Sequence, residues 1–186
     1  MLAAEELETV APGLWIWQAY DPAVKADLFS TAIATKSGIY LVDPIPLRPK
    51  ALCNLTNFGA VSGIVITNQN HTRACDQFAA TFRTAVYDPS TSEGDLTGIP
   101  IDGGPLGEMA VYCPSEGGTV IVGDALINSE PYGFALLPAK YCTNLKLMRA
   151  SLPRLLDYSF TRILFAHGTP ITSRARERLE ELLQHR

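Results

Sequence analysis

This chain of 186 residues has no run of lysine or arginine, no C-x-x-C pair and no apolar run that approaches the length of a membrane span. Its net charge is -4, and a chain without a basic patch is a poor partner for nucleic acid or an anionic membrane surface. A transmembrane helix needs about 20 consecutive apolar residues. We therefore expect neither nucleic acid nor a membrane as a partner.

The cysteines and the N-terminus indicate a reducing compartment. Cys53, Cys75, Cys113 and Cys142 are far apart in the sequence, which argues against a zinc knuckle or a redox motif. The first residues, "MLAAEELETVAPGLW", are acidic where a signal peptide would be basic and then apolar. We expect reduced thiols and a cytoplasmic protein.

The length and composition predict a single domain over residues 1–186. Hydrophobic residues make up 47% of the chain, and a chain of this size can bury about two-thirds of its unfolded surface without a disulfide or metal. No internal repeat or linker interrupts the sequence.

The pattern of apolar and turn residues predicts strands and helices in a mixed order. Strands are expected over residues 13–20, 28–44 with a turn at Lys36-Ser37-Gly38, 61–67, 84–89, 99–104, 108–114, 117–127 and 161–171. Helices are expected over residues 47–58, 73–82, 146–157 with an interruption at Pro153, and 173–185. Such a mixture of antiparallel and βα pieces favours a layered α/β sandwich.

Polar residues follow three of the predicted strands directly. They are Thr67 to Arg73 after "SGIVI", Gly123-Asp124-Ala125 after "TVIV", and His167-Gly168 after "RILFA". Loops at strand ends carry functional side chains because the sheet fixes their positions while their polar tips stay accessible. Each stretch alone is ordinary turn chemistry, but together they indicate a site.

The order and spacing of these stretches resemble the metallo-beta-lactamase fold over nearly the whole chain. The resemblance is carried by "APGLWIW", "GIYLVDP", "SGIVITNQNHTR", "GGTVIVGDAL" and "RILFAHGTPI". It implies an α/β (α+β) fold class, a four-layer αββα sandwich with a metal site where these loops meet. It also implies a hydrolase by fold, which is an analogy and not chemistry.

The family's T-H-x-H-x-D-H motif holds one or two zinc or iron ions, and this sequence departs from it. Thr67 keeps its place, while the resemblance puts the ligand positions on Asn68, Asn70, Thr72, Arg73 and, in "GGPLGE", Gly104. Asp124 and His167 match the remaining ligands. The chain is also similar to a divergent branch of the family in which a histidine and an arginine, here His71 and Arg73, follow this strand.

Zinc prefers imidazole, thiolate or carboxylate ligands, and amide oxygens are weak substitutes. Arg73 places a permanent positive charge at a ligand position, where it would repel a cation and could form a salt bridge with Asp124. We therefore expect no cofactor. Zinc is the alternative, with Asp124, His167 and His71 as its ligands.

Our leading hypothesis is a metal-free protein that binds or senses a small anionic molecule. Asn68, Asn70, His71 and Arg73 would bind this ligand, and Asp124 and His167 are the candidate catalytic residues if activity remains. The alternative is a one-metal hydrolase of an ester, thioester or phosphodiester. A third hypothesis is a homodimer formed through the tyrosine-rich segment "INSEPYGFALLPAKYC".

Several of these residues also have a purely structural interpretation. Asn68 and Asn70 could close an Asx-turn or cap a helix, and Asp124 could serve as a structural ion-pair partner. Cys75 lies one turn into a predicted helix beside Arg73, where its pKa could be lowered, and we weigh a nucleophilic role for it.

Overall fold

The computed structural model describes residues 2–90 and 94–184 and forms two compact units. Unit 1 is Met1–Ile66 with His71–Asp88, and unit 2 is Thr67–Asn70 with Pro89–Arg186. The chain thus leaves unit 1 for a short stretch directly after its fifth strand and then returns. That a single domain spans residues 1–186 stays a prediction.

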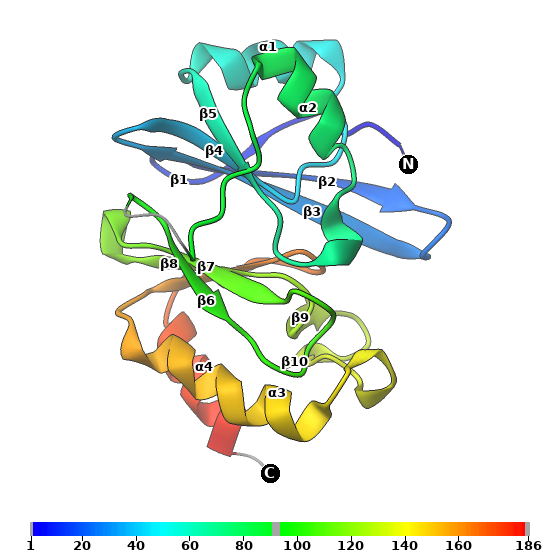
Figure 1. Cartoon of the computed structure of the whole chain (residues 1–186), viewed down its shortest axis with the longest axis vertical. Coiled ribbons are helices and arrows are strands. Elements are labelled where there is room, and N and C mark those ends of the chain that lie inside the picture. Colours follow the sequence, from blue (N-terminus) through cyan, green and yellow to red (C-terminus); the bar gives the residue numbers. More distant parts are fainter. Residues whose placement is uncertain (1, 91–93, 185–186) are drawn as a thin grey trace. The chain divides into compact units, whose positions relative to one another are not determined.

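Unit 1 is a five-stranded sheet with two helices on one face (Figure 1). The strand order is β1-β2-β3-β4-β5, with antiparallel neighbours up to β4 and a parallel pair at β4 and β5. The elements are β1 (Glu8–Ala11), β2 (Leu14–Asp21), β3 (Ala26–Thr35), β4 (Gly38–Val42), α1 (Pro49–Asn57), β5 (Val61–Val65) and α2 (Cys75–Phe82).

The helices of unit 1 cover the sheet because their apolar stripes complete its core. Ala51 and Leu55 of α1 and Phe78 of α2 are buried with Trp17 and Leu41 from the strands. A proline at the first turn starts α1, where its missing N–H costs no hydrogen bond.

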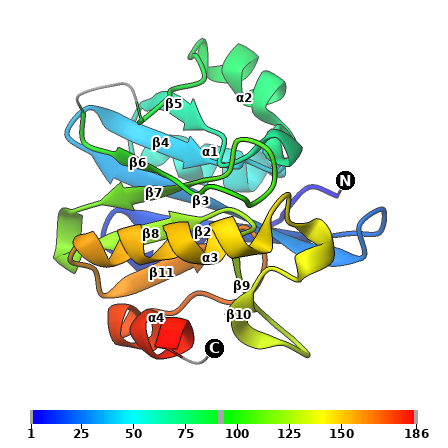
Figure 2. The same cartoon turned by 60° about the horizontal axis from the view of Figure 1, so that its bottom comes forward.

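Unit 2 contains a four-stranded sheet, a separate hairpin and two helices (Figure 2). The sheet order is β11-β8-β7-β6, and β9 pairs with β10. The elements are β6 (Thr97–Pro100), β7 (Met109–Cys113), β8 (Thr119–Val122), β9 (Leu126–Ser129), β10 (Gly133–Leu136), α3 (Leu145–Ser151), β11 (Arg162–Phe165) and α4 (Ala175–Gln184). Alternate residues of β8 and β11 pack with both helices in one core, including Val120, Ile163, Met148 and Leu179.

The register of β8 and β11 positions a candidate site. These strands are parallel, and Phe165 is paired with Val122 at their carboxyl ends. The residues that follow both strands therefore emerge at the same edge of the sheet. Asp124 and His167 are two residues beyond Val122 and Phe165.

Several predicted elements differ in the structure. Residues 84–89 form no strand, because only Val86 makes an isolated bridge, to Ile64. The helix expected over 146–157 ends as α3 at Ser151 and continues as a 3-10 helix, Leu152–Asp157, because Pro153 has no N–H. Residues 128–136, which lie outside the predicted strands, form most of the hairpin of β9 and β10.

Among the helices described, none combines the length and the apolar character that crossing a membrane requires.

Candidate functional site

Asp124 and His167 lie side by side in unit 2, directly after the parallel strands β8 and β11. Nε2 of His167 is 3.2 Å from Oδ1 of Asp124, and the His167 side chain is 24% exposed. A partly exposed imidazole against a carboxylate is an arrangement that supports proton transfer or ligand binding. The structure thus brings together Asp124 and His167, which the sequence singled out because they follow predicted strands. Their role stays a prediction.

The side-chain amide of Asn68 connects two buried carboxylates in the same unit. Its Nδ2 donates to Oε2 of Glu108 over 2.8 Å and to Oδ2 of Asp124 over 3.1 Å. Asn68, Glu108 and Asp124 are 2%, 4% and 8% exposed. An amide nitrogen has two hydrogens and no lone pair to offer, so it serves these carboxylates as a neutral double donor.

The other end of the Asn68 amide is also engaged. Its Oδ1 accepts the backbone N–H of Asn70 over 2.9 Å, which closes an Asx-turn at the end of the strand. This is the structural interpretation that the sequence allowed for Asn68. This hydrogen bond fixes the orientation of the Asn68 amide, so that its nitrogen faces the carboxylates. The side chain of Asn70 is exposed.

Glu108 is a site residue that sequence reasoning missed. Besides the Asn68 amide, its carboxylate accepts the backbone N–H of Ala125 through Oε1 over 2.9 Å, which ties the loop before β7 to the loop after β8. A Cβ at Gly123 would lie 2.9 Å from Oε1 of Glu108 and 2.6 Å from Oγ1 of Thr67. The glycine at position 123 therefore leaves the room that the carboxylate occupies.

The resemblance places a ligand position of the family at Gly104, and the contacts there show how little room a side chain would have. A Cβ on Gly104 would lie 2.9 Å from Cγ and 3.0 Å from Cβ of Glu108. The Glu108 side chain thus fills the space into which a larger residue at this position would extend. Of the resembled zinc positions in unit 2, Asn68 turns N–H donors toward the site and Gly104 has no side chain, so neither supplies a ligand, whereas Asp124 and His167 are a carboxylate and an imidazole that zinc accepts.

Unit 1 holds a second buried polar cluster, centred on Asp43. Nδ1 of His71 lies 2.9 Å from Oδ2 of Asp43, and both side chains are 3% exposed. The carbonyl of Asp43 accepts the hydroxyl of Ser30 over 2.6 Å. Asp43 has a φ of 50°, a left-handed conformation that is uncommon outside glycine and is tolerated best by Asn and Asp. The sequence pattern predicted only a strand end here.

Arg73 is also organised around Asp43. Its Nη1 donates to the carbonyl oxygens of Phe29 over 2.6 Å and of Asp43 over 3.1 Å. Arg73 itself has a φ of 37°. Two strained residues joined by a side-chain hydrogen bond are a feature often found at functional sites. The salt bridge predicted between Arg73 and Asp124 stays a prediction.

Cys75 does not have the environment of a nucleophile. Burial raises the pKa of its thiol to about 12, and the negative charges of Asp43 and Asp76 act in the same direction, while the charge of Arg73 opposes them. The thiol is therefore protonated near neutral pH, and only a thiolate attacks. The lowered pKa considered for Cys75 is wrong because desolvation outweighs Arg73.

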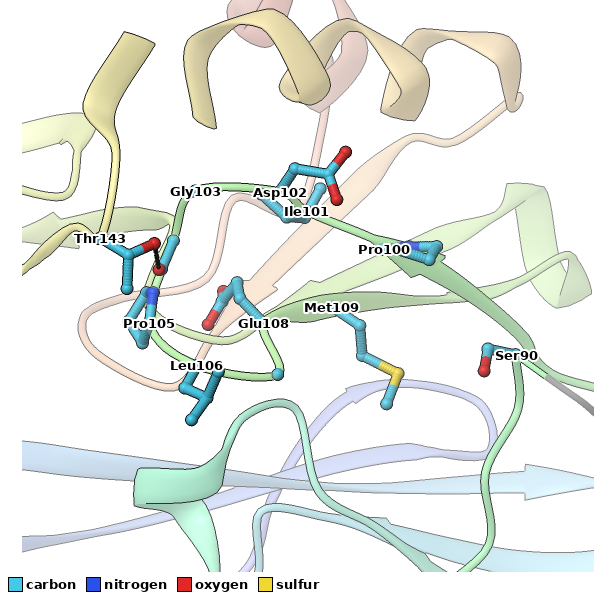
Figure 3. A pocket seen from close by; sticks show the side chains of 12 residues that line it. Ser90, Pro100, Ile101, Asp102, Gly103, Pro105, Leu106, Glu108, Met109 and Thr143 are labelled. Atoms are coloured by element: carbon cyan, nitrogen blue, oxygen red, sulfur yellow. Dashed lines mark hydrogen bonds between the residues drawn. The ribbon is translucent and has the colours of Figure 1, made fainter. Parts of the chain in front are cut away.

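Unit 2 contains a cavity of about 380 Å³ beside Glu108 (Figure 3). Figure 3 shows the hydroxyl of Thr143 donating to the carbonyl oxygen of Gly104, a bond of 2.8 Å that braces the wall. The carboxylates of Asp102 and Glu108 and the apolar side chains of Leu106 and Met109 line the cavity. Among its described lining residues there is no lysine, arginine or histidine, so this cavity is a poor place for an anion.

A family profile described as "Metallo-beta-lactamase superfamily" matches residues 8–103. No curated protein matches this chain.

Three solved structures illustrate the structural likeness. The metallo-beta-lactamase DIM-1 is 13% identical, with 96% of each chain covered and a TM-score of 0.69. The metallo-beta-lactamase from Pontibacter korlensis is 16% identical, with 97% of this chain and 99% of that chain covered and a TM-score of 0.67. The metallo-beta-lactamase FIM-1 from Pseudomonas aeruginosa, in its mono-zinc form, is 13% identical, with 98% and 96% covered and a TM-score of 0.68.

At these identities the likeness shows the fold alone. It confirms the predicted mixed α/β fold of the metallo-beta-lactamase type.

Proposed function

Because this chain belongs to the metallo-beta-lactamase superfamily, with a profile match over residues 8–103, we propose that it is a member that works without metal and binds a small anionic molecule. The observation that carries the proposal is the Asn68 amide, which donates to the carboxylates of both Glu108 and Asp124. A zinc site needs several lone-pair donors, and here an N–H donor faces the retained aspartate.

The anion would be bound by Arg73 and His71. Arg73 has a permanent positive charge, and guanidinium groups pair well with carboxylates and phosphates. The hydrogen bonds to the carbonyl oxygens of Phe29 and Asp43 hold the guanidinium in one position, which lowers the entropic cost of binding. The contact with Asp43 likewise fixes the His71 ring.

Calorimetric titration tests the proposal with named probes. Protein treated with chelator and then dialysed is titrated with citrate, with inorganic phosphate and with zinc chloride. We expect saturable binding of at least one anion and no stoichiometric zinc binding. Arg73→Gln should weaken anion binding by roughly tenfold, about 1.4 kcal/mol, whereas Arg154→Gln, in unit 2, should leave it unchanged. Binding of zinc at one ion per chain and of neither anion would overturn the proposal.

The second candidate is a one-metal hydrolase of an ester, thioester or phosphodiester. The observation in its favour is that Asp124 and His167, a carboxylate and an imidazole, lie 3.2 Å apart. It predicts hydrolysis of p-nitrophenyl acetate, acetylthiocholine or bis-p-nitrophenyl phosphate that a chelator removes and zinc restores, and that Asp124→Ala abolishes. Hydrolysis that does not respond to the chelator, or no hydrolysis, argues against this candidate.

A further inference from the structure

The outer edge of β2 is only partly covered in unit 1. β1 pairs with β2 from Ala11↔Leu14 to Glu8↔Ile16, and the pairing ends there. On its other side, β2 pairs with β3 as far as Asp21↔Ala26. Residues 17–21 of β2 therefore have a strand neighbour on one side, and in the described part of unit 1 no strand pairs with them on the other.

The direction of the backbone groups follows from the antiparallel pattern. The N–H of Ala34 in β3 donates to the carbonyl of Gly13, so odd-numbered residues of this stretch of β2 point their backbone groups toward β3. The backbone groups of Gln18 and Tyr20 then point toward the open edge. Over residues 2–90, no backbone hydrogen bond outside the β2 and β3 pairing involves these two residues.

A groove of about 610 Å³ lies along this edge. One wall is residues 16–20 of β2, and the other is the segment 2–8, in which only Glu8 is paired with β2. Ala4 anchors that segment by a bridge to Leu47, so the wall is held and not a loose end. Tyr20 is 49% exposed, and its ring offers an apolar surface at the groove.

The negative charges that line the groove favour a basic binding partner. Glu5, Glu6 and Glu8 line it, all three are exposed, and none forms an ion pair within the described residues. The strand edge itself, Gln18 to Tyr20, is uncharged, whereas strands protected against pairing usually carry charge, proline or a bulge on the strand itself. A second copy of this edge would bring like charges together, which disfavours self-pairing.

We propose that this groove binds an extended, lysine- or arginine-rich segment of a partner protein, which adds a strand to the sheet along Gln18 and Tyr20. Backbone hydrogen bonds to these two residues would supply affinity, and the three glutamates would select basic side chains. Strand addition of this kind separates affinity, which comes from the main chain, from specificity, which comes from side chains. The inference is independent of the anion-binding proposal.

The test uses a fluorescent peptide in which lysine and valine alternate over roughly eight residues, the length of an ordinary strand. Its fluorescence anisotropy is followed as the full chain is added. We expect saturable binding that weakens by roughly tenfold or more in Glu5→Lys/Glu6→Lys/Glu8→Lys. The matched control Glu130→Lys/Glu177→Lys/Glu181→Lys makes the same charge change at exposed positions in unit 2 and should bind as the native chain does.

Two further arms separate strand addition from simple charge attraction. The same peptide, N-methylated at alternate residues, keeps every charge but loses half of its backbone donors, and it should bind at least roughly tenfold more weakly in one of the two methylation registers. Tyr20→Pro should also weaken binding, while circular dichroism and the melting temperature report whether the variant is folded. Lack of binding by the native chain, equal binding by both triple variants, or equal binding of the plain peptide and both methylated peptides would each overturn the proposal.

Discussion

The Nδ2 atom of Asn68 lies 3.1 Å from Oδ2 of Asp124 and donates a hydrogen bond to it. The same nitrogen donates to Glu108, so one neutral amide serves two buried carboxylates. Asp124, which the resemblance places at the aspartate position of the family's metal site, is thus held by an amide donor. This relationship determines which substitutions the site should tolerate.

Asn68→Asp keeps the size of the side chain and the acceptor for the Asn70 N–H, but it removes both donors. We expect a loss of about 2 kcal/mol in the free energy of unfolding, because Glu108 and Asp124 lose a donor and face a third carboxylate. Urea denaturation measures this loss. Asn70→Asp is the control, since its side chain is exposed and its backbone N–H is unchanged. Equal stabilities of the two variants would contradict the role of Asn68.

Glu108→Gln tests the residue that connects the loops before β7 and after β8. A glutamine can bring its own N–H group toward the Asn68 amide or toward the N–H of Ala125, and either contact places two donors together. The expected cost is about 2 kcal/mol, measured by the same denaturation. If the contact with Asn68 is direct, the double variant Asn68→Asp/Glu108→Gln should lose less than the sum of the single losses, because Gln can donate to Asp. Strict additivity would argue that the pair is not coupled.

Asp43→Asn isolates the charge in the cluster of unit 1. Asparagine tolerates the left-handed φ of 50°, so the backbone is spared while the charge facing His71 is removed. We expect a loss of about 2 kcal/mol in the free energy of unfolding. Asp43→Ala should lose at least about 1 kcal/mol more, because alanine does not favour this conformation. An Asp43→Asn variant with the same free energy of unfolding as the native chain would show that the contact with His71 contributes nothing to stability.

The raised pKa of Cys75 predicts both slow labelling and a pH dependence. At pH 8 iodoacetamide should modify the exposed Cys53 and spare Cys75 in folded protein, as read by mass spectrometry. Between pH 9 and pH 12 the unfolded thiol loses its proton while the folded thiol keeps it, so stability falls as pH rises. Cys75 contributes at most about 1.4 kcal/mol per pH unit to this fall. The slope should flatten in Cys75→Ala, and rapid labelling of Cys75 would refute the assignment.

The sequence predicted the parts of the site that depend on local pattern. Asp124 and His167 could be paired because each follows a short apolar strand, and parallel neighbours place such ends at one edge. Glu108 could not be found in this way, because its burial depends on Asn68, 40 residues earlier, and on the space left by Gly104 and Gly123. Glu108 belongs to the site because of long-range packing, and no local sequence pattern marks it.

The backbone geometry was also beyond sequence reasoning. An aspartate before a proline is typical of a strand end, and nothing in "LVDP" indicates that Asp43 adopts a left-handed conformation and contacts His71. The hairpin of β9 and β10 was missed because its turn contains Pro131 and Tyr132 in place of the usual Asn-Gly or Asp-Gly pair. The open edge of β2 depends on the register of β1, which no sequence pattern indicates.

The metal content of the native chain tests the central claim most directly. Protein purified without chelator and without added metal is analysed for zinc and iron by inductively coupled plasma mass spectrometry. We predict far less than one ion per chain for both metals, and no change in melting temperature when a chelator is added. One zinc or iron per chain, with a melting temperature that falls on chelation, would contradict this prediction.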